Sequence, residues 1–171
     1  VDEQARPLSG SLTTALLASA TLRAEPGATI IHNLICSRVV AEVIAEQGGR
    51  AVRSRVGHSF VKVAMASEGA AFGGEHSGHY YFRDNFGADS GIIAALLVLE
   101  ALSSHDGPLS DLVAPFDHYA ASGEINFEVD DPGAALDTVA AFYAGHPQDR
   151  LDGLTVDAGD WWLNLRPSNT E

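Results

Sequence analysis

The segment FGGEHSGHY, residues 72–80, places one carboxylate, one serine hydroxyl and two imidazoles among three glycines. The glycines allow a sharp turn and a close approach between a ligand and the backbone. Glu75 can accept two hydrogen bonds and Ser77 can donate and accept one, which suits the vicinal hydroxyls of a sugar. His79 can carry a proton near neutral pH. From these residues alone, a ligand site and a solvated polar turn are both open.

The same segment raises the question of a zinc site, because His76 and His79 are three residues apart. Two imidazoles at this spacing on a helical turn can chelate a metal ion. The surrounding glycines disfavour a helix, however, and no cysteine lies nearby. We therefore expect no metal at this segment.

A second polar segment is RPSNTE, residues 166–171, which follows a predicted strand. Arg166 offers a planar fork of donors, Ser168 and Thr170 offer hydroxyls, and Asn169 offers an amide. Such a run of donors on a loop suits the oxygens of a phosphate group. The alternative is an ordinary Pro-Ser-Asn turn.

A third segment, RVGHSFVK at residues 55–62, also follows a predicted strand. Gly57, His58 and Ser59 stand where a helix is expected to begin, and the free N–H groups of a helix start suit an anion. The alternative is a glycine turn in which Ser59 caps the helix.

Composition narrows the classes of function. The 171 residues carry a formal net charge of −13, which argues against a nucleic-acid partner or an anionic membrane surface. A single cysteine, the lack of a signal peptide and apolar runs too short for a membrane span favour the cytoplasm. The chain starts at Val1 without an initiator Met and stops within RPSNTE, so we expect a piece of a longer protein.

Apolar periodicity predicts alternating helices and strands over the first two thirds of the chain. The predicted helices are 11–24, 37–47, 58–67 and 90–104, and the predicted strands are 28–33, 51–55, 70–73 and 79–82. Asp89 is expected to cap the last of these helices, with Ile93, Leu96, Leu97 and Ala101 on its inner face. This pattern predicts an α/β layered sheet domain, in which ligands bind beyond the carboxyl ends of the strands.

The remaining third has a different pattern. It predicts helices at 109–116 and 132–144, strands at 154–157 and 161–165 around a turn, and an alternating segment, EINFEV, at 124–129 that is typical of a strand. The fold class is therefore a layered α/β sheet domain followed by a smaller, truncated α+β domain. We expect residues 1–10 to end a preceding domain, 11–114 to form the first domain and 115–171 the second.

The order of three segments carries a family resemblance. GHSFVK, then GGEHSGHYYF, then RPSNTE resemble the sugar- and phosphate-binding loops of the α-D-phosphohexomutase superfamily. Residues 26–49, PGATIIHNLICSRVVAEVIAEQGG, also resemble the start of the third domain of those enzymes. Asn169 favours the phosphomannomutase/phosphoglucomutase group over phosphoglucosamine mutase, which tends to carry glycine there. The resemblance covers essentially the whole chain, as the end of domain two, domain three and most of domain four.

The resemblance implies a mechanism for the full-length enzyme. Members of the family interconvert hexose 1-phosphate and hexose 6-phosphate in a cleft between four domains. A phosphoserine in the first domain gives its phosphate to the sugar, a hexose 1,6-bisphosphate serves as intermediate and activator, and Mg²⁺ is held by an Asp-rich loop in the second domain. Neither of those loops is in this sequence. We therefore expect the missing N-terminal domains of the same polypeptide to be partners, and the fragment alone to be inactive.

The resemblance also implies site residues of three kinds. The candidate acid or base at the reaction centre is His79. The residues expected to contact the sugar are Gly57, His58, Glu75 and Ser77. The residues expected to hold the non-reacting phosphate are Arg166, Ser168, Asn169 and Thr170.

Two departures from the family pattern concern basic groups. Ile35 stands where many members carry lysine, and SGSLTT at residues 9–14 lacks an arginine that often opens the first helix of domain three. Arg38 and Arg55 are possible substitutes. A non-catalytic sugar-phosphate-binding module and a phosphoglucosamine mutase fragment remain as alternatives.

Overall fold

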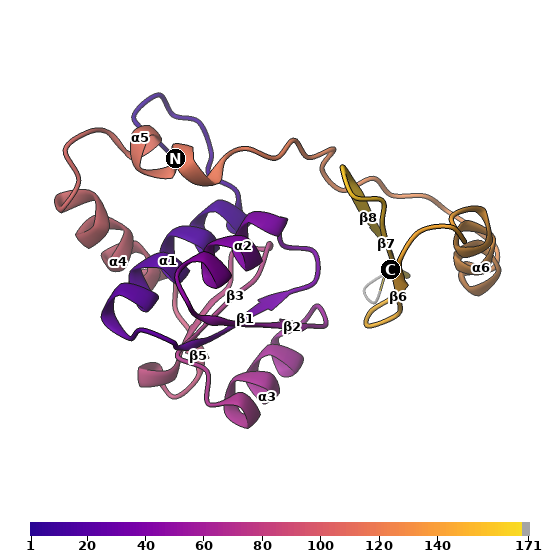
Figure 1. The fold of residues 1–171 in the computed structure, drawn as a ribbon, viewed down its shortest axis with the longest axis horizontal. Helices are drawn as coiled ribbons and strands as arrows, with labels where there is room; N and C mark the ends of the chain where they lie inside the picture. The colour runs from indigo at the N-terminus through magenta and orange to yellow at the C-terminus, as the bar shows by residue number, and fades with distance from the viewer. Residues whose placement is uncertain (169–171) are drawn as a thin grey trace. The chain divides into compact units, whose positions relative to one another are not determined.

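The computed structural model describes residues 1–168 of the chain. They fall into two compact units, the first spanning Val1–Ala120 and the second starting at Ala121 (Figure 1). From the sequence, the second domain is expected to start at residue 115. Each unit has a sheet of its own.

The first unit is built on a five-stranded sheet with the order β2-β1-β3-β4-β5. β1, β2 and β3 are parallel, whereas β4 is antiparallel to β3 and β5 is antiparallel to β4. The strands are β1 (Thr29–Asn33), β2 (Arg50–Ser54), β3 (Phe72–Gly74), β4 (Tyr80–Phe82) and β5 (Ala88–Asp89). The predicted α/β sheet domain is confirmed.

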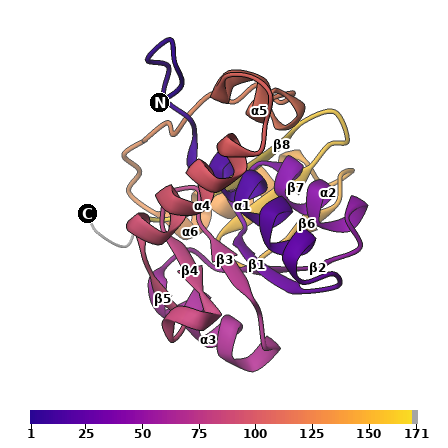
Figure 2. The same ribbon diagram turned by 90° about the vertical axis from the view of Figure 1, so that its left-hand side faces the viewer.

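Helices cover both faces of this sheet (Figures 1 and 2). They are α1 (Gly10–Ala24), α2 (Arg38–Glu46), α3 (His58–Glu68) and α4 (Gly91–Ser103), followed by the short α5 (Leu109–Val113) and the 3₁₀ turn η2 (Ala114–Phe116); another 3₁₀ turn, η1 (Arg83–Asn85), links β4 to β5. α1, α2 and α4 share one apolar cluster with the sheet, and α3 packs in a second cluster. The unit is therefore an α/β/α layered domain.

The central strand β1 contributes to both clusters. Ile30 belongs to the cluster of α1 and α2, and Ile31 belongs to the cluster of α3, as expected from the alternation of side chains along a strand. Both side chains are fully buried. Strands covered on both faces are apolar at successive positions, which is why the sequence here has no polar alternation.

α1 packs very closely on β3. Ser9 caps the helix by accepting a hydrogen bond from the Leu12 N–H. A Cβ atom at Gly74 would lie 2.4 Å from two side-chain atoms of Thr14, so only glycine fits at this position of β3. The Thr14 hydroxyl is buried here and has no hydrogen-bond partner among the described residues.

Thr14→Val is therefore expected to raise the free energy of unfolding of the first unit by about 1 kcal/mol, because an unsatisfied buried hydroxyl is replaced by a methyl group of similar shape. Urea denaturation followed by circular dichroism measures the change. Thr21→Val is the control, since the Thr21 hydroxyl donates to the Leu17 carbonyl at 2.8 Å. A Thr14→Val protein less stable than Thr21→Val would contradict the prediction.

α4 begins differently from the prediction. Ser90 caps the helix by accepting a hydrogen bond from the Ile93 N–H, and Asp89 instead ends β5. Asp89 was therefore the wrong cap by one residue. Ile93 and Leu97 pack against the core as predicted, but Leu96 is exposed, because it lies on the side of the helix turned away from the sheet.

None of the described helices is long and apolar enough to span a membrane.

The second unit combines one helix with a small antiparallel sheet. α6 (Pro132–Phe142) is capped by Asp131, and the sheet has the order β6-β7-β8. Its strands are β6 (Gln148–Asp149), β7 (Leu154–Asp157) and β8 (Trp162–Leu165). Gly159 has a φ of +83° in the turn between β7 and β8, as the predicted hairpin requires. The smaller α+β unit is confirmed.

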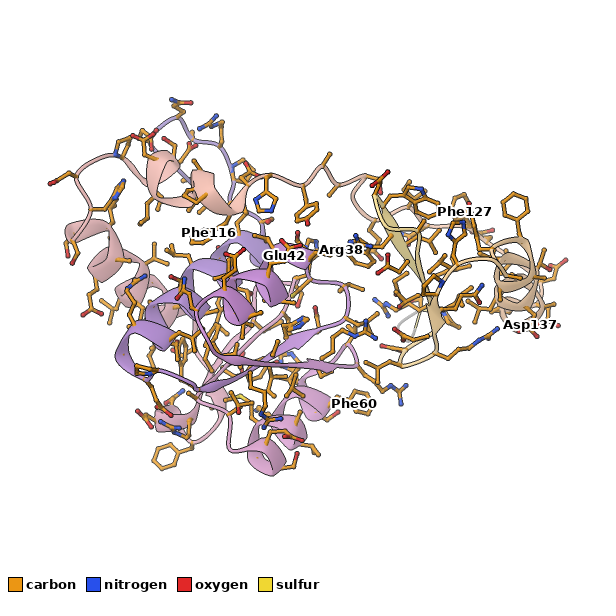
Figure 3. All side chains as sticks on the ribbon, viewed as in Figure 1. Arg38, Glu42, Phe60, Phe116, Phe127 and Asp137 are labelled. Atoms are coloured by element: carbon orange, nitrogen blue, oxygen red, sulfur yellow. The ribbon has the colours of Figure 1, made fainter. Side chains whose placement is uncertain are left out.

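The alternating segment 124–129 is not a strand in the structure. Its three apolar side chains are exposed, and Phe127, labelled in Figure 3, is 74% exposed. Alternation favours a strand only where a neighbouring strand supplies hydrogen bonds and a core covers the apolar face. No strand among residues 1–168 pairs with this segment, so the prediction was wrong for the described chain.

Candidate functional site

The carboxyl ends of three parallel strands meet at one edge of the first sheet. Asn33 ends β1 and pairs with Ser54 at the end of β2, and β3 ends next to them at Gly74. The three loops that leave these strands contain most of the predicted site residues of this unit. This edge is where ligands bind in open α/β sheets.

Glu75 is the centre of the site. Its side chain is buried, with the residue only 2% exposed. Oε1 accepts a hydrogen bond from the Tyr81 hydroxyl at 2.5 Å, and Oε2 accepts from Asn33 Nδ2 at 3.3 Å and from the Gly57 N–H at 3.4 Å. One carboxylate therefore joins the end of β1, the start of α3 and β4.

Asn33 fixes the next turn of the loop. Its Oδ1 accepts hydrogen bonds from the Cys36 thiol at 3.1 Å and from the His76 N–H at 3.4 Å. The His76 ring lies 2.9 Å from the Ser11 hydroxyl, which also accepts the Ser37 N–H. His76 is thus tied to α1, and it does not belong to a group of three possible metal ligands with His79 among the described residues.

A second imidazole, that of His58, lies beside His79. The two ring centroids are 4.2 Å apart, with an angle of 66° between the ring planes. His58 Nδ1 is 2.6 Å from the Tyr81 hydroxyl, and His79 Nδ1 is 3.3 Å from Asp89 Oδ2. The structure therefore brings together Glu75, His58 and His79, three of the residues predicted for the site.

The Tyr81 hydroxyl determines which nitrogen of His58 carries a proton. Burial and the neighbouring Glu75 carboxylate raise the pKa of Tyr81, so its single proton stays in place. That proton is donated to Oε1 of Glu75. His58 Nδ1 must then donate to the Tyr81 oxygen. This assigns the Nδ1–H tautomer to neutral His58 and leaves a lone pair on Nε2.

Asp89 is the hydrogen-bond partner of His79, as Tyr81 is of His58. Partial burial raises the pKa of Asp89, but its own backbone N–H, the hydrogen bond with His79 and the charge of the neighbouring imidazoles outweigh this effect and lower the pKa. The Asp89 carboxylate is therefore ionised over the neutral range. It can accept the Nδ1–H of His79 and stabilise the protonated ring.

The other predicted residues of this unit lie around the pair. Ser77 is exposed. Gly57 has a φ of +124° and caps α3, but its N–H is engaged by Glu75 and so is not free for an anion. Ser59 makes no capping hydrogen bond, since α3 has no side-chain cap. The Arg55 guanidinium lies 4.4 Å from the ring centroid of Phe60, an exposed residue labelled in Figure 3.

The predicted phosphate loop belongs to the second unit. Arg166 and Ser168 follow β8 in a segment without regular structure. Arg166 is partly exposed, and Ser168 is exposed. Asn169 and Thr170 lie outside the described residues, so their part in the loop stays a prediction.

Sequence reasoning missed three members of the site, Asn33, Tyr81 and Asp89. Asn33 was assigned only to the end of a strand, and Asp89 to a helix cap. Tyr81 pairs with Asp89 across β4 and β5, which places both beside the imidazoles. In the predicted strand 79–82, Tyr81 shares a face with His79, which was the available signal, although in the structure His79 precedes β4.

The reactivity of the Cys36 thiol tests how well this region is closed to solvent. Burial raises the pKa of its thiol to about 12, against an ordinary value of about 8.5. Below the raised pKa the thiol stays protonated, and the thiolate is the reactive form. The folded chain is therefore expected not to react with a disulfide reagent such as DTNB at pH 8, and to react once urea unfolds the first unit. Rapid stoichiometric labelling without urea would contradict this.

Among the described residues, one group of side chains has the composition of a metal site. His58, His79 and Asp89 each offer a ligand atom, and these atoms all lie within 4.8 Å of one another. Mg²⁺ prefers oxygen ligands in an octahedral arrangement. Two imidazoles and one carboxylate do not fit that preference, so this group is not a suitable Mg²⁺ site.

The fold and this site define a class of protein. The chain belongs to the phosphoglucomutase/phosphomannomutase family, because residues 9–119 match the family's alpha/beta/alpha domain III. It is 38% identical over 171 residues to a phosphomannomutase of Methanocaldococcus jannaschii, covering 100% of this chain and 38% of that protein. It is 42% identical over 173 residues to phosphohexose mutases of Xanthomonas campestris, covering 99% of this chain and 39% of that protein.

A solved structure shows the same architecture. The phosphoglucomutase/phosphomannomutase family protein of Burkholderia thailandensis matches with a TM-score of 0.85 and 29% identity, over 97% of this chain and 36% of that one. A putative phosphomannomutase of Thermus thermophilus shares the fold, with a TM-score of 0.68 at 17% identity. The family resemblance found in the sequence is confirmed, and this chain spans well under half the length of these relatives.

Proposed function

We propose that this chain acts within a hexose phosphate mutase that interconverts hexose 1-phosphate and hexose 6-phosphate through a phosphoserine and a bisphosphorylated sugar. The geometry of the first unit carries the proposal: two imidazoles in contact lie beside a buried carboxylate at the ligand-binding edge of the sheet. The names of the relatives, phosphomannomutase and phosphohexose mutase, support the same substrate class.

In this proposal the two imidazoles have different tasks. The Nε2 lone pair of His58 accepts a hydrogen bond from a sugar hydroxyl, because Tyr81 keeps the proton of the neutral ring on Nδ1. His79 exchanges a proton with the reacting oxygen, and Asp89 stabilises its protonated form. Ser77, on the exposed part of the loop, donates to or accepts from a neighbouring hydroxyl.

Glu75 serves sugar recognition through one of its two oxygens. Oε1 is held by a short hydrogen bond from Tyr81, whereas both hydrogen bonds to Oε2 are long, at 3.3 and 3.4 Å. Long hydrogen bonds are weak, so Oε2 is the oxygen that can turn to a sugar hydroxyl. In the second unit, the loop from Arg166 through Thr170 would bind the phosphate that does not react.

The chain's share of the reaction is binding and proton transfer. The phosphoserine and the Asp-rich Mg²⁺ loop that the family uses have no counterpart among these 171 residues. When bound to the longer enzyme, Mg²⁺ would neutralise charge on the transferring phosphate. We therefore propose that this chain binds hexose phosphates without turning them over.

Titration of glucose 1-phosphate and mannose 1-phosphate into the ¹⁵N-labelled chain tests the proposal. The expected result is saturable shifts of the amide signals of Gly57, His58, Ser77 and His79. Sorbitol is the control for a hydroxylated compound without phosphate or ring. In the same samples a coupled assay should detect no mutase activity. Absence of shifts at these residues, or turnover by the chain, would overturn the proposal.

Ser77→Ala is expected to weaken hexose phosphate binding by about tenfold, the loss of one good hydrogen bond. Because Ser77 is exposed, the substitution should leave the fold unchanged. The exposed Ser122→Ala in the second unit is the matched control and should bind like the unsubstituted chain. Equal affinities of the Ser77 and Ser122 variants would remove Ser77 from the site.

A further inference from the structure

We propose that His58, His79 and Asp89 form a binding site for a divalent transition-metal ion, with Zn²⁺ the best suited. The starting observation is that each residue can place one ligand atom within 4.8 Å of the ligand atoms of the other two. They come from the start of α3, the loop before β4 and the end of β5. The proposal does not depend on the proposed mutase function, since it concerns the binding of the ion alone.

The chemistry of the donors selects the class of ion. Two imidazoles and one carboxylate match the three-ligand sets that hold Zn²⁺ in proteins while leaving a fourth position open. Imidazole suits Zn²⁺, Cu²⁺ and Ni²⁺, whereas Mg²⁺ and Ca²⁺ select oxygen ligands. The site is therefore distinct in chemistry from the Mg²⁺ site that the family resemblance implies for another domain.

The surroundings of His58 prepare it to be a ligand. Metal-binding histidines usually donate the other ring N–H to an oxygen acceptor, which fixes the tautomer and orients the ring. His58 has such a partner in the Tyr81 hydroxyl at 2.6 Å, which is itself held by the buried Glu75 carboxylate at 2.5 Å. Tyr81 is fully buried, so this support is rigid. The unprotonated Nε2 of His58 is the available ligand atom.

The other two ligands are mobile enough to close around an ion. The side chains of His79 and Asp89 are 41% and 36% exposed, so they can turn without disturbing the core. Bonds of about 2.0–2.1 Å to a tetrahedral Zn²⁺ place ligand atoms about 3.3 Å apart. The present separations, which are at most 4.8 Å, therefore need to shorten by about 1.5 Å at most.

Metal titration of the 171-residue chain tests the proposal directly. After treatment with EDTA and its removal, ZnCl₂ is added in a calorimeter, and CoCl₂ is added while the visible absorption is recorded. We expect one ion per chain and the absorption bands of cobalt in a four- or five-coordinate site. His58→Ala and His79→Ala should each weaken Zn²⁺ binding at least tenfold. His118→Ala is the control, because His118 is an exposed histidine of the same unit that contacts Glu42 instead.

Tyr81→Phe separates the proposed site from binding by any two surface histidines. It removes the hydroxyl that orients His58 but leaves all three ligands in place, so Zn²⁺ affinity should fall by roughly 10-fold to 100-fold. Circular dichroism of each variant confirms that it is folded. The proposal fails if the chain binds no Zn²⁺, if binding survives in the His58→Ala, His79→Ala double variant, or if His118→Ala abolishes it.

Discussion

Glu75→Ala is expected to lower the free energy of unfolding of the first unit by about 3 kcal/mol, since buried hydrogen-bond donors lose their acceptor. The three donors are the Tyr81 hydroxyl, the Asn33 amide and the Gly57 N–H. The loss of these hydrogen bonds outweighs the relief of desolvation of one carboxylate, because the Tyr81 and Asn33 donors are fully buried. The same variant should also lose the hexose phosphate shifts at His58 and His79.

The chain contains separate reporters for measuring this effect. Its one cysteine, Cys36, lies in the first unit, and its two tryptophans, Trp161 and Trp162, lie in the second. Urea-dependent labelling of Cys36 therefore reports opening of the first unit, and tryptophan fluorescence reports the second. Glu75→Ala should shift the first transition to lower urea and leave the second in place.

The exposed Glu100→Ala on α4 is the matched control for removal of a glutamate, and should move neither transition. Adding Tyr81→Phe to Glu75→Ala removes one of the stranded donors. The double variant is therefore expected to be no less stable than Glu75→Ala alone, because coupled sites are not additive. Full additivity of the two losses would show that Tyr81 and Glu75 act separately.

Gly10→Ala should be nearly as disruptive, with an expected loss of about 2–3 kcal/mol in the free energy of unfolding from overpacking. A Cβ atom at Gly10 would lie 2.1 Å from the His76 carbonyl oxygen and 2.9 Å from the Glu75 carbonyl oxygen. Both atoms belong to the backbone, so a side-chain rotation cannot relieve the contact. The loop that carries Ser77 and His79 must move away from α1.

The measurement combines stability with the position of the loop. Cys36 labelling in urea gives the loss of stability, and the amide signals of His76 to His79 report displacement of the loop. Gly91→Ala is the control: Gly91 also starts a helix, but a Cβ atom there meets no atom within 4 Å. A Gly10→Ala chain as stable as Gly91→Ala, with unchanged loop signals, would contradict the close approach.

Much of the first unit could be predicted because its elements bury apolar faces with clear periods. The predicted helix 11–24 agrees within one residue with α1, and the predicted helix 37–47 agrees within one residue with α2 at both ends. In both, apolar residues recur at helical spacing and glycine or proline follows the end. The prediction for residues 124–129 failed because a strand depends on a partner, which local alternation does not supply.

The site could be predicted less completely than the helices of the first unit. The polar loops could be found, because Gly57 comes shortly after a predicted strand, and Glu75 and His79 each follow a glycine. Their partners could not, because the hydrogen bonds of Tyr81 and Asp89 depend on the antiparallel pairing of two very short strands. Nothing in the local sequence fixes that register. Because that register could not be predicted, Asp89 was interpreted as a helix cap and not as the end of a strand.

The Glu75 hydrogen-bond network has a consequence for the kinetics of binding. The loops at the ends of β1, β2 and β3 are tied to one buried carboxylate before any ligand arrives. Little conformational entropy is then lost when a ligand docks, and no slow loop ordering precedes the encounter. We expect different hexose phosphates to associate with this unit at similar rates. Differences in their affinity should then lie in how long each one stays bound.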